Sequence, residues 1–77
     1  MKYLDGRDIL LGDNVALGGN MTGIVVCCFD EGDYMPEFPR EKWATLGKGI
    51  LVNSTQAGLI HYPKPDIDLT LLSRAGP

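Results

Sequence analysis

Two cysteines and a single histidine are the residues of this sequence best suited to nucleophilic or metal chemistry. Cys27 and Cys28 are adjacent, and His61 is the only histidine. Neighbouring residues of a strand project to opposite faces, so the two thiols cannot converge on one metal ion. A zinc site needs a spaced cysteine pair with further ligands, which this sequence does not contain. We therefore expect no metal site and two buried cysteines that serve as packing residues.

Catalytic alternatives can be built from these residues, but each lacks a component. His61 could act as a base for a cysteine nucleophile, yet no aspartate or asparagine is placed to identify a third member. A pair of carboxylates drawn from Asp30, Asp33 or Glu37 would need one pKa raised by an apolar pocket, which so polar a loop does not supply. We expect a structural histidine, at the surface or half-buried, and a protein that is not an enzyme and needs no cofactor.

An acidic and aromatic segment, residues 30–49, interrupts the apolar pattern of the chain, and we call it the excursion. Its acids would steer a basic partner, and its aromatic side chains could anchor an interface. The alternative is a solvated loop whose aromatic side chains fold back onto the body of the domain. The stretch "DEGD" lacks the spacing of a calcium-binding loop. We predict a partner-binding surface made of Asp30, Glu31, Asp33, Tyr34, Glu37, Phe38 and Trp43.

Short strands must position this excursion. The run "TGIVVCCF", residues 22–29, is rich in β-branched residues and predicts a buried or strongly bent strand, with Gly23 at a bulge or close backbone approach. Residues 50–53 and 59–62 predict a hairpin. Within the excursion, Pro39 and the helix formers after it predict about two turns of helix that stop at Gly47.

The two ends of the chain also predict β structure. Near the start, Asp5-Gly6 and Gly12-Asp13 mark turns between short apolar stretches. Near the end, "IDLTLLSR" alternates so that Ile67, Leu69 and Leu71 should point inward in a last strand. We expect residues 75–77 to fray. Together these elements predict a mainly β domain of about five short strands, a bent barrel or two orthogonal sheets, with one helix in the 30–49 excursion.

Composition narrows the class of protein. The chain has 77 residues, 44% of them apolar, which suits one globular domain covering residues 1–77. A net charge of -3 argues against binding to nucleic acid or to anionic lipid. The longest apolar run is far short of the ~20 residues that span a bilayer, and the start of the chain does not look like a signal peptide. Two cysteines agree with a reducing compartment, so we expect a cytoplasmic protein.

The order of the motifs resembles a known class of small domains. "DGRDILLGDNVAL", "TGIVV", "GILV" and "GLIHY" resemble the SH3-like small barrels, in which a G-D-x-V strand is followed by a turn and a G-x-V-V strand. The whole pattern also looks like small bacterial immunity proteins, which neutralise interbacterial toxins. This resemblance implies an inhibitor that covers a basic site on a toxin or enzyme, although a fold does not determine a function.

Two other functions stay open at this point. A nucleic-acid-associated SH3-like module would use basic residues that are scattered along the chain and would need folding to gather them. A homo-oligomeric structural subunit would pair through an open barrel edge or through the Tyr34 to Trp43 surface. The seven basic residues are Lys2, Arg7, Arg40, Lys42, Lys48, Lys64 and Arg74.

Overall fold

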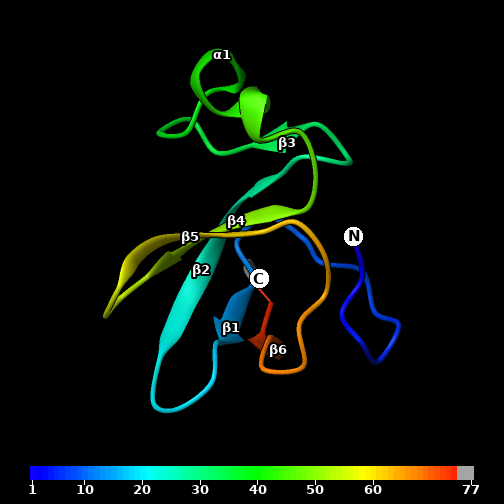
Figure 1. Cartoon of the computed structure of the whole chain (residues 1–77), viewed down its shortest axis with the longest axis vertical. Helices are drawn as coiled ribbons and strands as arrows, with labels where there is room; N and C mark the ends of the chain where they lie inside the picture. Colours follow the sequence, from blue (N-terminus) through cyan, green and yellow to red (C-terminus); the bar gives the residue numbers. More distant parts are fainter. Residues whose placement is uncertain (75–77) are drawn as a thin grey trace.

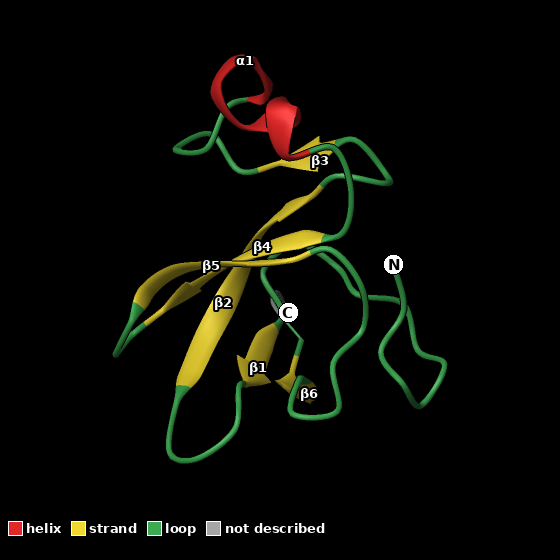
Figure 2. Ribbon diagram, in the orientation of Figure 1, coloured by secondary structure: helices red, strands yellow, loops and turns green. Residues whose placement is uncertain are grey.

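One antiparallel sheet dominates the computed structural model, which describes residues 1–74 (Figures 1 and 2). The mainly β class and the single helical segment predicted from the sequence are confirmed. The elements in chain order are β1 (Asn14–Ala16), β2 (Thr22–Cys28), β3 (Asp33–Tyr34), α1 (Arg40–Trp43), the 3-10 turn η1 (Ala44–Leu46), β4 (Ile50–Ser54), β5 (Gly58–Tyr62) and β6 (Thr70–Ser73).

Strand β2 is the centre of the sheet, whose order is β5-β4-β2-β1-β6. One edge of β2 pairs first with β1 and then, at Cys27 and Cys28, with the two residues of β3. The other edge pairs with β4 along its length, with a register shift between Val25 and Cys27. The extra residue, Val26, is a bulge that bends the strand. The predicted strand at residues 22–29 is therefore present and bent.

The sheet is open. Strands β5 and β6 end the strand order, and within residues 1–74 no backbone pairing joins them into a closed barrel. The five predicted strands correspond to β1, β2, β4, β5 and β6, and β3 is a sixth, two-residue strand inside the excursion. The edges that a closed barrel would remove are consequently left at the two ends of the sheet.

The β4–β5 hairpin forms where the sequence predicts it, and glycines allow the backbones around it to approach closely. The Ser54 hydroxyl accepts a hydrogen bond from the Ala57 amide at 2.7 Å inside the turn. A side chain at Gly23 would place its Cβ 2.7 Å from Val52 Cγ1, which confirms the predicted close approach. At Gly49, with φ +82°, a Cβ would lie 1.9 Å from the Tyr62 carbonyl oxygen. Only glycine fits at that crossing.

Two separate apolar cores flank the sheet, one on each face. The bulge at Val26 lets two successive residues, Val26 and Cys27, face one core, while Cys28 faces the other. Both cysteines are buried and free, on opposite sides as predicted. The first core consists of Tyr3, Ile9, Val15, Leu17, Val25, Cys28, Ile50, Val52 and Leu69. The second core consists of Val26, Cys27, Phe29 and Leu51.

The last strand is shorter than predicted. Ile67 was expected to point inward, but it is 81% exposed, whereas Leu69 is buried and Leu71 is half-buried. The reason is a turn, in which the Asp66 side chain accepts the Asp68 amide at 2.8 Å and the Asp66 carbonyl accepts the Leu69 amide at 3.0 Å. Aspartate favours such side-chain-to-backbone turns over a strand, so the alternation begins only after them.

The predicted helix is confirmed as α1 followed by η1. Pro39 precedes the helix in an extended conformation, with ψ 151°, rather than occupying its first position. Gly47 ends the helical segment with φ +82°. The segment lies at one end of the molecule beside β3 (Figure 1).

Candidate functional site

The aromatic side chains of the excursion fold onto the second core. Tyr34, Met35, Phe38, Trp43 and Leu46 pack against it, and all five side chains stay half-buried. The rings of Phe38 and Trp43 lie 5.9 Å apart, and those of Phe29 and Tyr34 meet edge to face at 5.8 Å. The aromatic side chains therefore fold back onto the domain, as the predicted alternative has it, but part of each ring still faces solvent.

Arg40 holds the aromatic side of the excursion together. Its guanidinium lies 5.0 Å above the Tyr34 ring, and it donates a hydrogen bond to the Gly32 carbonyl at 3.0 Å. A cation over an aromatic face adds about 0.5–1 kcal/mol at an exposed site. The start of the helix is thereby fixed to the turn before β3.

The four predicted acids do not share one environment. Asp30 and Glu31 lie 3.7 Å and 2.6 Å from the amino group of Met1, whose side chain packs against the first core. Asp30 also accepts the Gly49 amide at 3.3 Å. Asp33 and Glu37 are exposed and form no ion pair with the residues of the described chain.

The structure thus divides the predicted surface by face. Asp30 and Glu31 lie toward the first core, whereas Phe38 and Trp43 cover the second. Asp33 sits in β3 beside Tyr34, at the boundary between the two. Among the four predicted acids, those free to meet a partner next to the aromatic rings are therefore Asp33 and Glu37.

Cys27, Cys28 and His61 each contact a backbone carbonyl group of another part of the chain. Cys27 and Cys28 each lie 3.7 Å from a backbone carbonyl, of Phe38 and Ile9 respectively. Burial raises the pKa of both thiols, that of Cys28 to about 12, so both are protonated at neutral pH. His61 is half-buried, with Nε2 2.8 Å from the Lys48 carbonyl and its ring edge-on to Phe29. The half-buried position of His61 is as expected, and these contacts hold its ring against Phe29 and the Lys48 carbonyl.

Neither a metal cluster nor a spanning helix is found in the described part of the chain. Residues 1–74 contain no group of three or more histidine, cysteine, aspartate or glutamate side chains that could hold a metal ion. No helix in the same range is long and apolar enough to cross a membrane.

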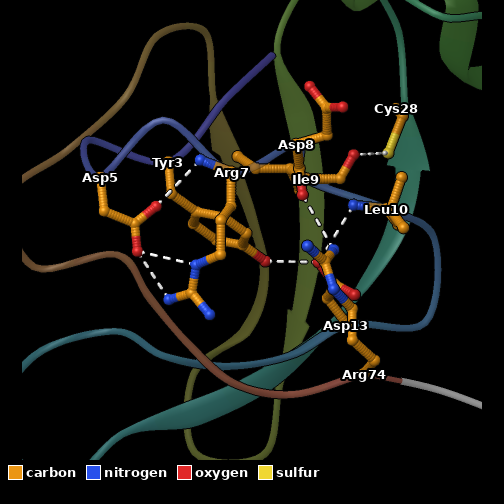
Figure 3. Close-up of polar contacts among 9 residues, drawn as sticks. All are labelled: Tyr3, Asp5, Arg7, Asp8, Ile9, Leu10, Asp13, Cys28 and Arg74. Atoms are coloured by element: carbon orange, nitrogen blue, oxygen red, sulfur yellow. Dashed lines mark hydrogen bonds and ion pairs between the residues drawn. The ribbon is translucent and has the colours of Figure 1, made fainter.

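A buried polar cluster joins the two ends of the domain (Figure 3). The Asp13 carboxylate is buried, and its Oδ2 accepts hydrogen bonds from the Tyr3 hydroxyl at 2.6 Å and the Leu10 amide at 3.0 Å. Arg74 donates to the same Oδ2 at 2.9 Å and to the Asp8 carbonyl at 2.8 Å. Burial and the hydrogen bond to Asp13 raise the pKa of Tyr3. The Arg74–Asp13 ion pair thus links the residue after β6 to the N-terminal part of the chain.

Sequence reasoning placed Asp13 only in a turn and did not find this cluster. A signal was available, because Asp13 precedes Val15 and Leu17 at a spacing of two, and all three residues are buried. A carboxylate in phase with buried strand positions indicates a buried polar partner. The partner itself, Arg74, is 61 residues away, and no local pattern identifies it.

Most of the basic residues of the described chain already have partners. Lys2 pairs with Asp8, Arg7 with Asp5 and Arg74 with Asp13. Arg40 is engaged by Tyr34 and Gly32. A continuous basic stripe of the kind that binds a phosphate backbone would have to compete with these contacts.

Comparison with known proteins finds no relative of this chain. The chain matches no protein-family model, no curated protein and no solved structure.

Proposed function

We propose that this protein is a non-enzymatic, cytoplasmic protein-binding domain of the immunity or antitoxin type, which inhibits a toxin or enzyme by covering a basic site on it. The excursion supplies the recognition surface in this proposal. Its aromatic rings anchor the partner, and its exposed acids steer the partner's basic residues into place.

The observation that carries the proposal is the half-buried state of Tyr34, Phe38 and Trp43. One side of each ring is held by the second core, so little side-chain entropy is lost when a partner covers the other side. Asp33 and Glu37 lie in the same segment with carboxylates free to meet a cation. A rigid aromatic layer rimmed by acids suits a basic protein surface.

The SH3-like barrel is part of the same proposal. Its support is the central, bulged β2, which shares one edge between β1 and β3 and gives the other edge to β4. The bulge at Val26 bends β2 and increases the local twist of the sheet, as the strong curvature of a small barrel requires. A barrel architecture does not determine a binding function, and the residues that support binding are those of the excursion.

The test begins with affinity purification of the tagged protein from its own cells, followed by mass spectrometry. Recovery of one stoichiometric, basic protein is expected, and recovery of none overturns the proposal. Binding of that partner is then measured for Asp33→Lys and Glu37→Lys. Each reversal should weaken affinity at least about tenfold, or about 1.4 kcal/mol, because it brings like charges together.

Asp8→Lys provides the matched control for these reversals. Asp8 has 68% side-chain exposure and lies outside the excursion, and its reversal changes the net charge by the same amount. If Asp8→Lys weakened binding as much as Asp33→Lys, the effect would come from overall charge and the assignment to the excursion would be wrong.

Self-association is a second candidate, favoured by the end of the sheet at β5. Its sequence, "GLIHY", contains none of the lysines, acids or prolines that commonly protect an edge strand. An antiparallel pair of β5 strands from two copies would use the same residues on both sides. Light scattering over a range of protein concentrations should then show a dimer, and a constant monomer mass would exclude it.

A further inference from the structure

One basic residue of the excursion, Arg40, is seated on an aromatic ring rather than on an acid. Its guanidinium lies 5.0 Å from the centre of the Tyr34 ring and donates a hydrogen bond to the Gly32 carbonyl at 3.0 Å. Arg40 forms no ion pair with a carboxylate of residues 1–74, although Glu37 lies only three residues before it. The ring and the carbonyl therefore make a position that holds a guanidinium without a counter-ion.

The parts of this position differ in how firmly they are held. Tyr34 packs against the second core and is half-buried, so the ring is fixed from below. Arg40 is exposed on α1, which lies beside β3 at one end of the molecule (Figure 2). A Cβ at Gly32 would lie 3.0 Å from Arg40 Nη2, so glycine leaves the room that the guanidinium uses. The ring and the carbonyl stay in place if the Arg40 side chain swings into solvent.

The same contacts identify the chemistry that the position accepts. A guanidinium is planar, so it can lie over a ring face and donate from its edge to a carbonyl at the same time, and it is more weakly hydrated than an ammonium. Asp33 and Glu37 lie in the same segment, and their carboxylates form no ion pair in the described chain. A second guanidinium would make the two contacts of Arg40 and would also be attracted by these acids.

We infer that Arg40 occupies a recognition site for an arginine side chain of the partner, and that the partner's guanidinium replaces that of Arg40 over Tyr34. This inference rests on the function proposed above and names the side chain by which the basic partner is anchored. Arg40 is then an internal competitor. It lowers the apparent affinity for the partner's arginine in proportion to the share of molecules in which it covers the ring.

The strength of the Arg40 contact sets the size of this competition. A cation over an exposed ring shifts an equilibrium by roughly two- to fivefold. The position is then free in roughly a third to a sixth of the molecules. Removal of the Arg40 guanidinium should therefore raise the apparent affinity for an arginine probe by roughly three- to sixfold.

The test is a titration of the ¹⁵N-labelled protein with the blocked peptide acetyl-Gly-Arg-Gly-amide at constant ionic strength, followed by the backbone amide shifts of residues 32–34. Arg40→Gln should bind this peptide at least about threefold more tightly than the unsubstituted protein does. Lys42→Gln is the matched control, because Lys42 is exposed in the same helix and its substitution removes the same charge. The inference is overturned if Arg40→Gln gains no more than Lys42→Gln, or if it shows no saturable shifts up to ~100 mM peptide.

A second peptide tests the preference for a guanidinium. Acetyl-Gly-Lys-Gly-amide should bind Arg40→Gln at least about twofold more weakly than the arginine peptide, because an ammonium lacks the planar edge that reaches the Gly32 carbonyl. Equal binding of the two peptides would show a general attraction of cations by the acids and would contradict the inference.

A second variant keeps the test decisive if Arg40→Gln loosens the excursion, which urea denaturation followed by Trp43 fluorescence would show. Arg40→Lys retains the charge but loses the planar group, so it competes less well and should bind the arginine peptide more tightly than the unsubstituted protein. Absence of any gain in Arg40→Lys would then overturn the inference.

These titrations use no partner protein, so they separate this inference from the proposed function. If the arginine peptide behaves as expected but affinity purification recovers no partner, the inhibitor function is wrong and the arginine site stands. If a partner is recovered and the charge reversals weaken its binding, but Arg40→Gln binds the arginine peptide no better than the unsubstituted protein, this inference alone is wrong.

Discussion

Removing one hydroxyl group, by Tyr3→Phe, should destabilise the domain far more than the loss of a single oxygen atom suggests. The hydroxyl donates to Asp13 Oδ2 at 2.6 Å in a buried setting. Asp13 Oδ1 is also buried and has no hydrogen-bond partner in the described chain, so the carboxylate cannot compensate through its second oxygen. After the substitution, Asp13 keeps only the Leu10 amide and Arg74.

The expected loss is about 2 kcal/mol in the free energy of unfolding. A hydrogen bond to a charged group contributes roughly 1.5–3 kcal/mol, and the void left by one oxygen adds little. Domains of this size have total stabilities of roughly 4–12 kcal/mol, so the loss is a large share. It corresponds to a fall in Tm of roughly 8–16 °C.

The same substitution should change the response to alkaline pH. Burial and then the bond to Asp13 raise the pKa of Tyr3, so the folded chain keeps a proton that the unfolded chain loses near pH 10. Stability from this group is complete below pH 10 and is lost as pH rises, by up to about 1.4 kcal/mol per pH unit. Tyr3→Phe removes this titration, and its stability should fall less steeply above pH 10.

Urea denaturation followed by Trp43 fluorescence measures both effects. Tyr62→Phe is the control at pH 7, because Tyr62 is half-buried and its hydroxyl makes no hydrogen bond to another residue in the range 1–74. It should cost less than about 0.5 kcal/mol. The reasoning fails if Tyr3→Phe costs no more than Tyr62→Phe, or if its loss of stability above pH 10 parallels that of the unsubstituted protein.

Two further predictions concern backbone crossing and thiol burial. Gly49→Ala should lower the free energy of unfolding by at least about 2 kcal/mol more than Gly47→Ala does. Both glycines have φ +82°, but only a Cβ at Gly49 would meet backbone atoms. The midpoints of urea denaturation measure the difference. In Cys28→Ala, the free energy of unfolding should fall less steeply with pH between about pH 9 and 12. The reason is that the folded thiol, whose pKa is raised to about 12, keeps its proton in this range while the thiol of the unfolded chain ionises. An unchanged alkaline slope for Cys28→Ala would show that this thiol does not contribute.

Local patterns were enough to predict the elements whose neighbours are close in sequence. The β4–β5 hairpin follows from two apolar runs on either side of a short polar turn, and its partners are adjacent in the chain. Strand geometry places Cys27 and Cys28 on opposite faces, and the frequent burial of free cysteine predicts that both are buried. The short helix follows from Pro39 and Gly47 at its two ends.

Patterns failed where a side chain has a distant or competing partner. Ile67 looked like an inward strand residue, but the Asp66 side chain and carbonyl bind the next amides and form a turn instead. Asp30 and Glu31 lie apart from the aromatic rings because they contact the amino group of Met1, which is 30 residues from Glu31 in sequence. Nothing in the composition of the excursion encodes this division.

The adjacent cysteines have a consequence for how the opening of this domain can be followed. Cys27 belongs to the core covered by the excursion, and Cys28 to the core closed by Tyr3 and Leu69. If the excursion lifts while the rest of the sheet stays folded, Cys27 alone becomes accessible to a thiol reagent. If the two ends of the chain detach first, Cys28 is labelled first. The labelling rate of each single-cysteine variant would therefore report the local opening of one core, although the two cysteines are adjacent in sequence.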